Sequence, residues 1–312
     1  MIGRGDQMTP LEDRWWALTG PSPRHEPSGY LSTAHDAFRV LDRQYIIGPL
    51  TLDPGPRQTV DYIQLLAKGW SRSVAWPIIV SGLIDREWPE VDRLASRQLH
   101  RLCCLLSLVW GEAWQVRIAP QRTSSLPPEV PEPILVPAVT WPDWDDSTQI
   151  GCREEAPLPD WFSEAWQRLE DGANRSVLAP ALSLWHEGIL LQSEHPSMAI
   201  ISYVAAVEQV AAPVLGADGK RSSRQSFMQC VDKVATPDDL AALKKADVYG
   251  KRSATSHGGA LHGIELEFGH PLLHPLGPGD PTFDFMFDTL RRMARIARSA
   301  LIEALRKPLA AT

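Results

Sequence analysis

The chain has 312 residues, of which 44% are hydrophobic and 22% charged, a composition typical of a soluble protein with one large or two medium domains. Its formal net charge of −7 disfavours broad, sequence-independent binding to duplex nucleic acid. We find no signal peptide and no apolar run of the roughly 20 residues that a membrane span requires, so we expect a cytoplasmic protein that does not associate with membranes.

Cysteine spacing predicts neither a disulfide framework nor a zinc site. The four cysteines form no CxxC pair, which favours reduced, buried thiols: Cys103, Cys104, Cys152 and Cys230. His186–Glu187 and Glu194–His195 lack a third ligand in a metal-site pattern, so we expect no metal. No phosphate-binding lysine loop, dinucleotide fingerprint or nucleophile elbow is present, and we therefore expect no cofactor.

The N-terminal half predicts mixed α and β structure. Residues 1–35 are rich in Pro, Gly, Ser and charge, with Trp15–Trp16 as the one apolar anchor, and we expect a partly ordered arm. Residues 36–150 predict an α+β domain. Its expected elements are a short helix over 60–66, a strand over 76–80, a helix opened by Pro89 and running to Trp110, and a strand over 114–118.

A proline-rich segment separates this domain from a helical C-terminal half. Nine prolines between 119 and 160 predict a linker, with one short strand at 134–136. Residues 157–312 predict an all-α domain with helices over 159–171, 178–193, 196–215, 222–234, 237–257 and 281–307. Thr236–Asp239 is a helix-start signal, and Gly258–Gly259 is a stop.

The segment 249–258, YGKRSATSHG, carries the residues best suited to phosphodiester chemistry without a metal. His257 has a side chain that takes and gives protons near neutrality, and the Arg252 fork matches phosphate oxygens. Helical spacing makes Arg252 a neighbour of Ser256, and Ser253 a neighbour of His257, with Lys251 adding charge. The negative end of the helix favours protonated His257. The alternative is that Arg252 caps the helix end and His257 is an ordinary surface residue.

An apolar helix supplies a candidate partner for this arginine. Residues 198–210 are apolar nearly all round, which predicts a helix buried on several sides, and Glu208 interrupts it. A buried carboxylate needs a partner, so we hypothesise that Glu208 pairs with Arg252 or with backbone donors of a neighbouring helix. The alternative is that Glu208 emerges at the edge of the helix.

These two helices together resemble the HEPN superfamily, and most closely its ApeA-like branch. The resemblance covers roughly residues 180–307 and rests on Glu208, Tyr249, Arg252 and His257, with Gly258 after the histidine. It implies a helical bundle that dimerises, and a metal-independent endoribonuclease of antiviral, abortive-infection, toxin–antitoxin or stress systems. His257 would then be the general acid or base at the ribose 2′-OH, and Arg252 would stabilise charge on the phosphate. The product would be a 2′,3′-cyclic phosphate, made where two copies of the motif face each other.

One departure keeps a second function open. Many active HEPN proteins have Asn, Asp or His after the arginine, where this chain has Ser253, so a non-catalytic nucleotide-binding, dimerisation or sensor module is the alternative. The expected partners are RNA, a second copy of the chain, and an antitoxin or phage-derived trigger. An arginine stripe on the last helix is either a track for the RNA backbone or a solvated face: Arg291, Arg292, Arg295 and Arg298.

Overall fold

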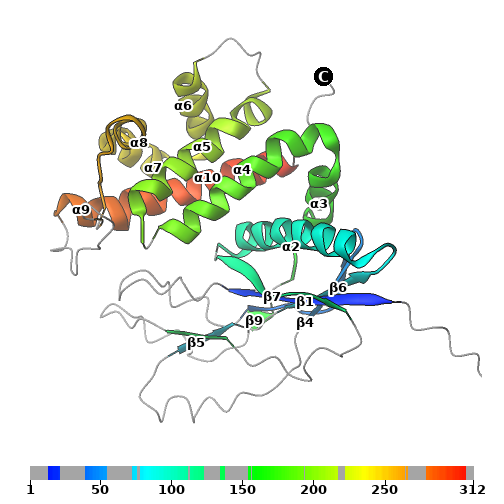
Figure 1. The fold of residues 1–312 in the computed structure, drawn as a ribbon. Coiled ribbons are helices and arrows are strands. Elements are labelled where there is room, and N and C mark those ends of the chain that lie inside the picture. Colours follow the sequence, from blue (N-terminus) through cyan, green and yellow to red (C-terminus); the bar gives the residue numbers. More distant parts are fainter. Residues whose placement is uncertain are drawn as a thin grey trace, which may run out of the picture.

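The computed structural model describes residues 13–21, 39–54, 72–75, 78–111, 113–122, 134–137, 154–155, 157–192, 194–216, 222–263, 265 and 279–306. An antiparallel sheet lies at one end of the molecule, one long helix covers it, and a group of helices lies beyond that helix (Figure 1). The predicted mixed α+β fold is therefore confirmed, because the strands come mostly from the N-terminal half and the C-terminal half is helical.

The main sheet has five strands in the order β3-β4-β6-β1-β7, and every neighbouring pair is antiparallel. Its strands are β1 (Arg14–Pro21), β3 (Tyr45–Ile47), β4 (Leu50–Pro54), β6 (Ile78–Leu83) and β7 (Trp114–Arg122). Two smaller ladders pair β2 (Arg39–Val40) with β9 (Glu154–Glu155), and β5 (Arg72–Ala75) with β8 (Ile134–Pro137). The strands predicted at 76–80, 114–118 and 134–136 correspond to β6, β7 and β8, while the helix predicted at 60–66 lies outside the described residues.

Strand β1 corrects the expectation for the N-terminus. Residues 14–21, predicted to belong to a partly ordered arm, lie near the middle of the sheet between β6 and β7. Trp16 is paired with Ser81 on one side and Gln121 on the other, and it is buried together with Trp15. The prediction missed this strand because its partners lie far along the chain and its flanks are rich in turn-forming residues. Strand β7 also runs to Arg122, so the linker begins later than residue 119.

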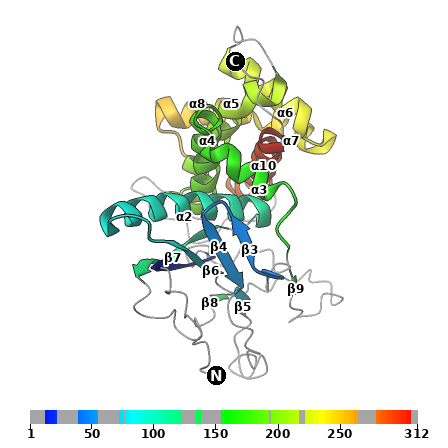
Figure 2. The same cartoon turned by 90° about the vertical axis from the view of Figure 1, so that its right-hand side faces the viewer.

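Helix α2 (Trp88–Trp110) lies between the sheet and the other helices (Figure 2). It contacts β7 on one side and α4 on the other, and it ends at Gly111, whose φ of 74° is the left-handed conformation that glycine adopts without strain. Pro89 lies in its first turn, as predicted. Buried side chains form one connected core from the sheet through α2 into the helices beyond.

The remaining helices are α3 (Phe162–Glu170), α4 (Gly172–Leu191), α5 (Pro196–Leu215), α6 (Ser223–Val234), α7 (Pro237–Ala246), α8 (Val248–Gly258), α9 (Pro281–Asp284), the π-helix η3 (Phe285–Leu290) and α10 (Arg291–Arg306). Helix α4 begins earlier than the predicted residue 178, directly after Asp171 ends α3. The predicted helix over 237–257 is wrong as one element, because the chain breaks at Asp247 into α7 and α8.

Helix α5 is the centre of the helical part and contacts α4, α6, α8 and α10. Among the described residues it is the one helix long and apolar enough to cross a bilayer: it has 20 residues, and an 18-residue stretch of it has a mean hydropathy of 1.7. That finding differs from our expectation that no apolar run reaches this length. More than half of that stretch (56%) is buried inside the protein, as expected for the core helix of a bundle.

Three of the four cysteines lie among the described residues, and all three are unpaired and buried: Cys103, Cys104 and Cys230. Burial raises the pKa of Cys104 and that of Cys230 to about 12, so both remain neutral thiols. The expectation of reduced, buried thiols is confirmed for these three.

Candidate functional site

The arginine–histidine segment forms a short helix of its own. Asp247 begins α8 from a left-handed conformation with φ of 46°, and its Oδ1 accepts a hydrogen bond from the Gly250 N–H at 3.2 Å. Short polar side chains tolerate this conformation better than most others do. Gly259, with φ of 66°, ends the helix, as the predicted Gly258–Gly259 stop required.

A hydrogen-bonded cluster joins α5 to α8. The Tyr249 hydroxyl donates to Glu208 Oε1 at 3.0 Å, and Arg252 Nη2 donates to Glu208 Oε2 at 3.3 Å. The hypothesis that Glu208 pairs with Arg252 is therefore confirmed. The side chains of Arg252 and Glu208 are only 25% and 16% exposed, so water screens this ion pair less than a pair on the open surface.

Tyr249 lies beside two guanidinium groups. The Cζ atoms of Arg252 and Arg224 lie 5.7 and 5.8 Å from its ring centroid, within the range of a cation–π interaction. Burial, followed by the hydrogen bond to the Glu208 carboxylate, raises the pKa of Tyr249, so its hydroxyl stays a donor at neutral pH. Arg252 Nε is buried and has no hydrogen-bond partner among the described residues, so that part of the chain does not fully satisfy the guanidinium.

His257 lies on the last turn of α8 and is exposed, with no partner for its ring among the described residues. Arg252 and His257 are five positions apart, which points their side chains about 140° apart around an α-helix. Ser256 is exposed on the Arg252 side, and Ser253 is half-buried on the His257 side. One copy of α8 therefore presents the arginine toward α5 and the histidine toward solvent.

The chain after α8 returns to the start of α5, a feature that the sequence did not reveal. Glu265 is buried, and its carboxylate accepts hydrogen bonds from the Ser197 N–H, the Ser197 hydroxyl (3.1 Å) and the Gly263 N–H (3.1 Å). Since Ser197 lies in the first turn of α5, the carboxylate is at the positive end of that helix. These bonds hold the segment that follows α8 against the start of α5.

Phe285 of the π-helix η3 lies beside two side chains, Lys251 of α8 and His262 of the segment that follows α8. Lys251 Nζ lies 5.7 Å from the Phe285 ring centroid, and the centroids of the His262 and Phe285 rings are 5.6 Å apart. His262 Nε2 donates to the Lys251 carbonyl at 3.3 Å. Burial, and then the neighbouring Lys251 charge, lowers the pKa of His262, so its ring is neutral at pH 7. Helix η3 contacts α5, and π-helical turns are frequent at functional sites.

The arginine stripe of α10 is largely engaged in contacts within the chain. Arg292 and Arg295 both donate to Asp239 Oδ1, at 2.7 and 2.8 Å. Arg298 donates to the carbonyls of Leu108 and Val109 at the end of α2, so its guanidinium is bound within the chain, and its place on an RNA track stays a prediction.

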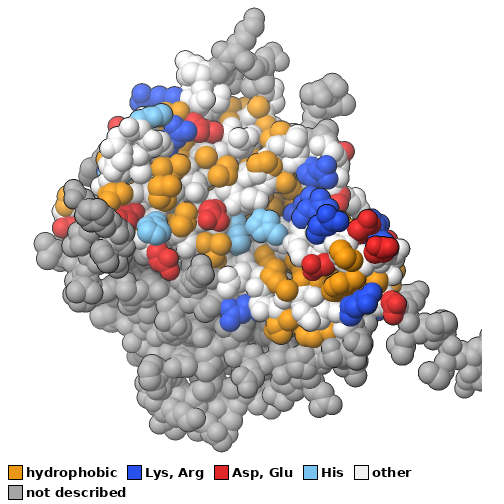
Figure 3. All heavy atoms as spheres, in the orientation of Figure 1, with side chains coloured by type: hydrophobic (Ala, Val, Ile, Leu, Met, Phe, Trp, Pro, Cys, Tyr) orange, Lys and Arg blue, Asp and Glu red, His pale blue; other side chains and the backbone are white. Residues whose placement is uncertain are grey.

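Burial and then the neighbouring Arg295 charge lower the pKa of Arg291, the remaining arginine of the stripe. Acidic and basic side chains are interspersed over the described face in Figure 3, which shows no single broad basic field on this side.

Metal-binding side chains do not gather among the described residues, where no group of three or more His, Cys, Asp or Glu could hold an ion. His186 of α4 is instead buried, and its Nε2–H donates to the Trp114 carbonyl of β7 at 2.7 Å.

Comparison with known proteins adds no relative: no protein-family model, curated protein or solved structure matches this chain. The case for a function therefore rests on the residues and their geometry.

Proposed function

We propose that this protein is a HEPN-type, metal-independent endoribonuclease of a bacterial antiviral, abortive-infection or stress system. The observation that carries the proposal is the Glu208–Arg252–Tyr249 cluster, which holds an arginine on α8 with an exposed histidine at the end of the same helix. In the proposed reaction, His257 takes or gives the proton at the ribose 2′-OH and Arg252 stabilises charge developing on the phosphate, which yields a 2′,3′-cyclic phosphate.

The divergence of Arg252 and His257 around α8 favours a site shared by two copies of the chain. In a twofold dimer that packs through this end of α8, the exposed histidines of the two copies face each other, and each lies on the same helix as its own Arg252, so both motifs border one shared site. An antitoxin or a phage-derived trigger is the proposed regulator, and RNA is the proposed substrate.

Cleavage of single-stranded RNA in EDTA tests the catalytic roles. We expect wild-type protein to release 2′,3′-cyclic phosphate ends, and His257→Ala or Arg252→Ala to be at least about 100-fold slower, the usual contribution of a positioned acid or base. Arg175→Ala, on the exposed surface of α4, is the matched control and should cut like wild type. Equal activity in all four proteins contradicts the proposal, and sedimentation equilibrium tests the dimer.

The second candidate is a non-catalytic HEPN module that binds nucleotides or mediates dimerisation. It is favoured by Ser253 after the arginine and by the ion pair that already neutralises much of the Arg252 charge. This function predicts ligand binding or dimerisation without any RNA product, and a His257-dependent cyclic phosphate end rules it out.

A further inference from the structure

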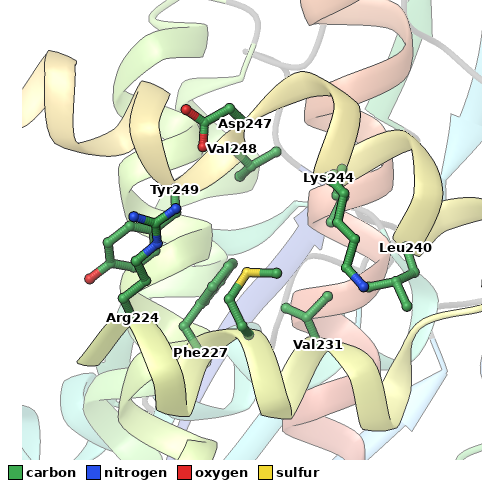
Figure 4. A pocket seen from close by; sticks show the side chains of 10 residues that line it. Arg224, Phe227, Val231, Leu240, Lys244, Asp247, Val248 and Tyr249 are labelled. Carbon is green, nitrogen blue, oxygen red and sulfur yellow. The ribbon is translucent and has the colours of Figure 1, made fainter. Parts of the chain in front are cut away.

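A pocket of about 150 Å³ opens between α6, α7 and the start of α8 (Figure 4). Its apolar lining comes from Phe227, Met228, Val231, Leu240, Leu243 and Val248. An engineered protein cavity of about 150 Å³ binds benzene, so a six-membered ring is the size of group that this space admits. The apolar lining favours the flat face of such a ring over a hydrated ion.

Charged groups stand at the rim of this apolar pocket. Arg224, beside Tyr249, and Lys244, beside Leu240, lie on opposite sides of it in Figure 4. Lys244 Nζ is 3.5 Å from Asp232 Oδ1, with both side chains about half exposed, so this pair is weak and leaves the ammonium able to bind another anion.

Asp247 adds an acceptor to the rim. Its Oδ1 accepts from the Gly250 N–H, whereas Oδ2 has no hydrogen-bond partner among the described residues. A carboxylate oxygen accepts from the N–H groups on the edge of a nucleobase. The pocket thus combines an apolar slot, an acceptor for ring-edge donors and two cations for an attached phosphate.

Tyr249 connects this pocket to the candidate site. Its ring lines the pocket, while its hydroxyl is bound to Glu208, which holds Arg252. The guanidinium groups of Arg224 and Arg252 both lie within 6 Å of that ring. The pocket is therefore linked to the arginine of the candidate site through one side chain, Tyr249.

We propose that the pocket between α6, α7 and α8 binds the nucleobase of one nucleotide, with its phosphate held by the rim cations Arg224 and Lys244. If the nucleotide is part of an RNA substrate, the pocket holds the base next to the scissile phosphate, and this role rests on the proposed ribonuclease function. As a site for a free mononucleotide it is independent of cleavage.

Titration of the full-length protein with AMP, GMP, CMP and UMP, followed by calorimetry, tests the pocket. The protein carries His257→Ala, so that cleavage plays no part. We expect at least one mononucleotide to bind, Met228→Trp to abolish binding by filling the pocket, and Arg224→Ala and Lys244→Ala each to weaken it about tenfold, as loss of a base or phosphate contact does. Arg97→Ala, exposed on α2, is the charge-matched control and should bind normally.

Inorganic phosphate is the probe that separates base recognition from simple anion binding. Phosphate binding as tight as mononucleotide binding overturns the proposal, as does unchanged nucleotide affinity in Met228→Trp. Thermal unfolding of each variant checks that it folds, and the two cation variants decide the matter if Met228→Trp does not.

The outcomes for the pocket and for the nuclease are separable. If the wild-type protein cuts no RNA but binds a mononucleotide that Met228→Trp excludes, the pocket is supported and the nuclease function is contradicted. RNA cleavage that Met228→Trp leaves unchanged in rate and base preference overturns the role of the pocket in RNA recognition and leaves the nuclease standing.

Discussion

Arg252 contacts Glu208 and Tyr249, and the sequence predicted these two contacts to different extents. Glu208 was predictable as a partner, because a carboxylate within an apolar helix must be paired when it is buried. Tyr249 was singled out by the resemblance to HEPN proteins, but its hydrogen bond to the second Glu208 oxygen and its position beside two arginines depend on how α5, α6 and α8 pack. A half-buried ion pair of this kind is costly to break from one side, because the remaining charge stays partly desolvated.

We expect Glu208→Gln to lower the free energy of unfolding by about 1–3 kcal/mol at pH 7, because Arg252 keeps its charge and loses its ionic partner. Urea denaturation measures the change, and Glu187→Gln on the exposed face of α4 is the matched control. In a double-mutant cycle with Arg252→Gln the two effects should not add. Additive effects would show that the pair contributes nothing to stability.

The break between α7 and α8 shows where local patterns mislead at the scale of an element. Helical spacing runs through 237–257, and neither glycine nor proline occupies the position of the break, so one helix was predicted. The structure instead places Asp247 in the left-handed region, where it ends α7 and caps α8. The sequence alone did not identify Asp247 as a helix cap, because aspartate both starts helices and occurs within them. This break lets α8 contact α5 as a separate helix.

The substitution Asp247→Ala should lower the free energy of unfolding by about 1–3 kcal/mol, since it removes the cap and leaves a Cβ-bearing residue in the left-handed region with no compensating hydrogen bond. Asp247→Asn should be nearly neutral, because asparagine caps helices and tolerates this conformation. Urea denaturation of the two variants side by side measures the difference. Equal stability of the alanine and asparagine variants would contradict the assigned role of Asp247.

On the scale of the whole molecule, the sheet-bearing part and the helical part are joined by buried polar contacts as well as by a shared core. Arg298 of α10 donates to the last carbonyls of α2, a helix that has no basic residue in its own last turn. A cation from another element thus satisfies and stabilises the negative end of α2. His186 of α4 donates to β7 at Trp114, and the His100 ring of α2 lies 6.0 Å away.

Acid should loosen this junction through His186. Burial lowers its pKa, with His100 adding a smaller effect in the same direction, so the folded state favours the neutral ring. Below the unfolded pKa of about 6.5, the unfolded chain binds a proton that the folded chain resists, and stability therefore falls as the pH drops. His262, whose pKa is also lowered, acts in the same window.

We expect the free energy of unfolding to fall more between pH 7.5 and 5.5 in wild type than in His186→Gln, whose amide can still donate to the Trp114 carbonyl. Urea denaturation at the two pH values gives this difference, and comparison of the two proteins cancels the carboxylates that they share. An identical pH dependence in both proteins would contradict the role given to His186.

The sequence by itself determined what depends on neighbouring residues. The mixed fold, helix α2 opened by Pro89, the start of α7 at Thr236, and a helix end bearing Arg252 and His257 all follow from periodicity and caps.

Only the tertiary structure decided which distant segments meet. It placed Trp15 and Trp16 inside the sheet, diverted Arg298 to the end of α2, and closed an apolar pocket beside Tyr249. The physical reason is that strand partners, ion pairs and cavities depend on residues tens to hundreds of positions apart, which no local pattern encodes.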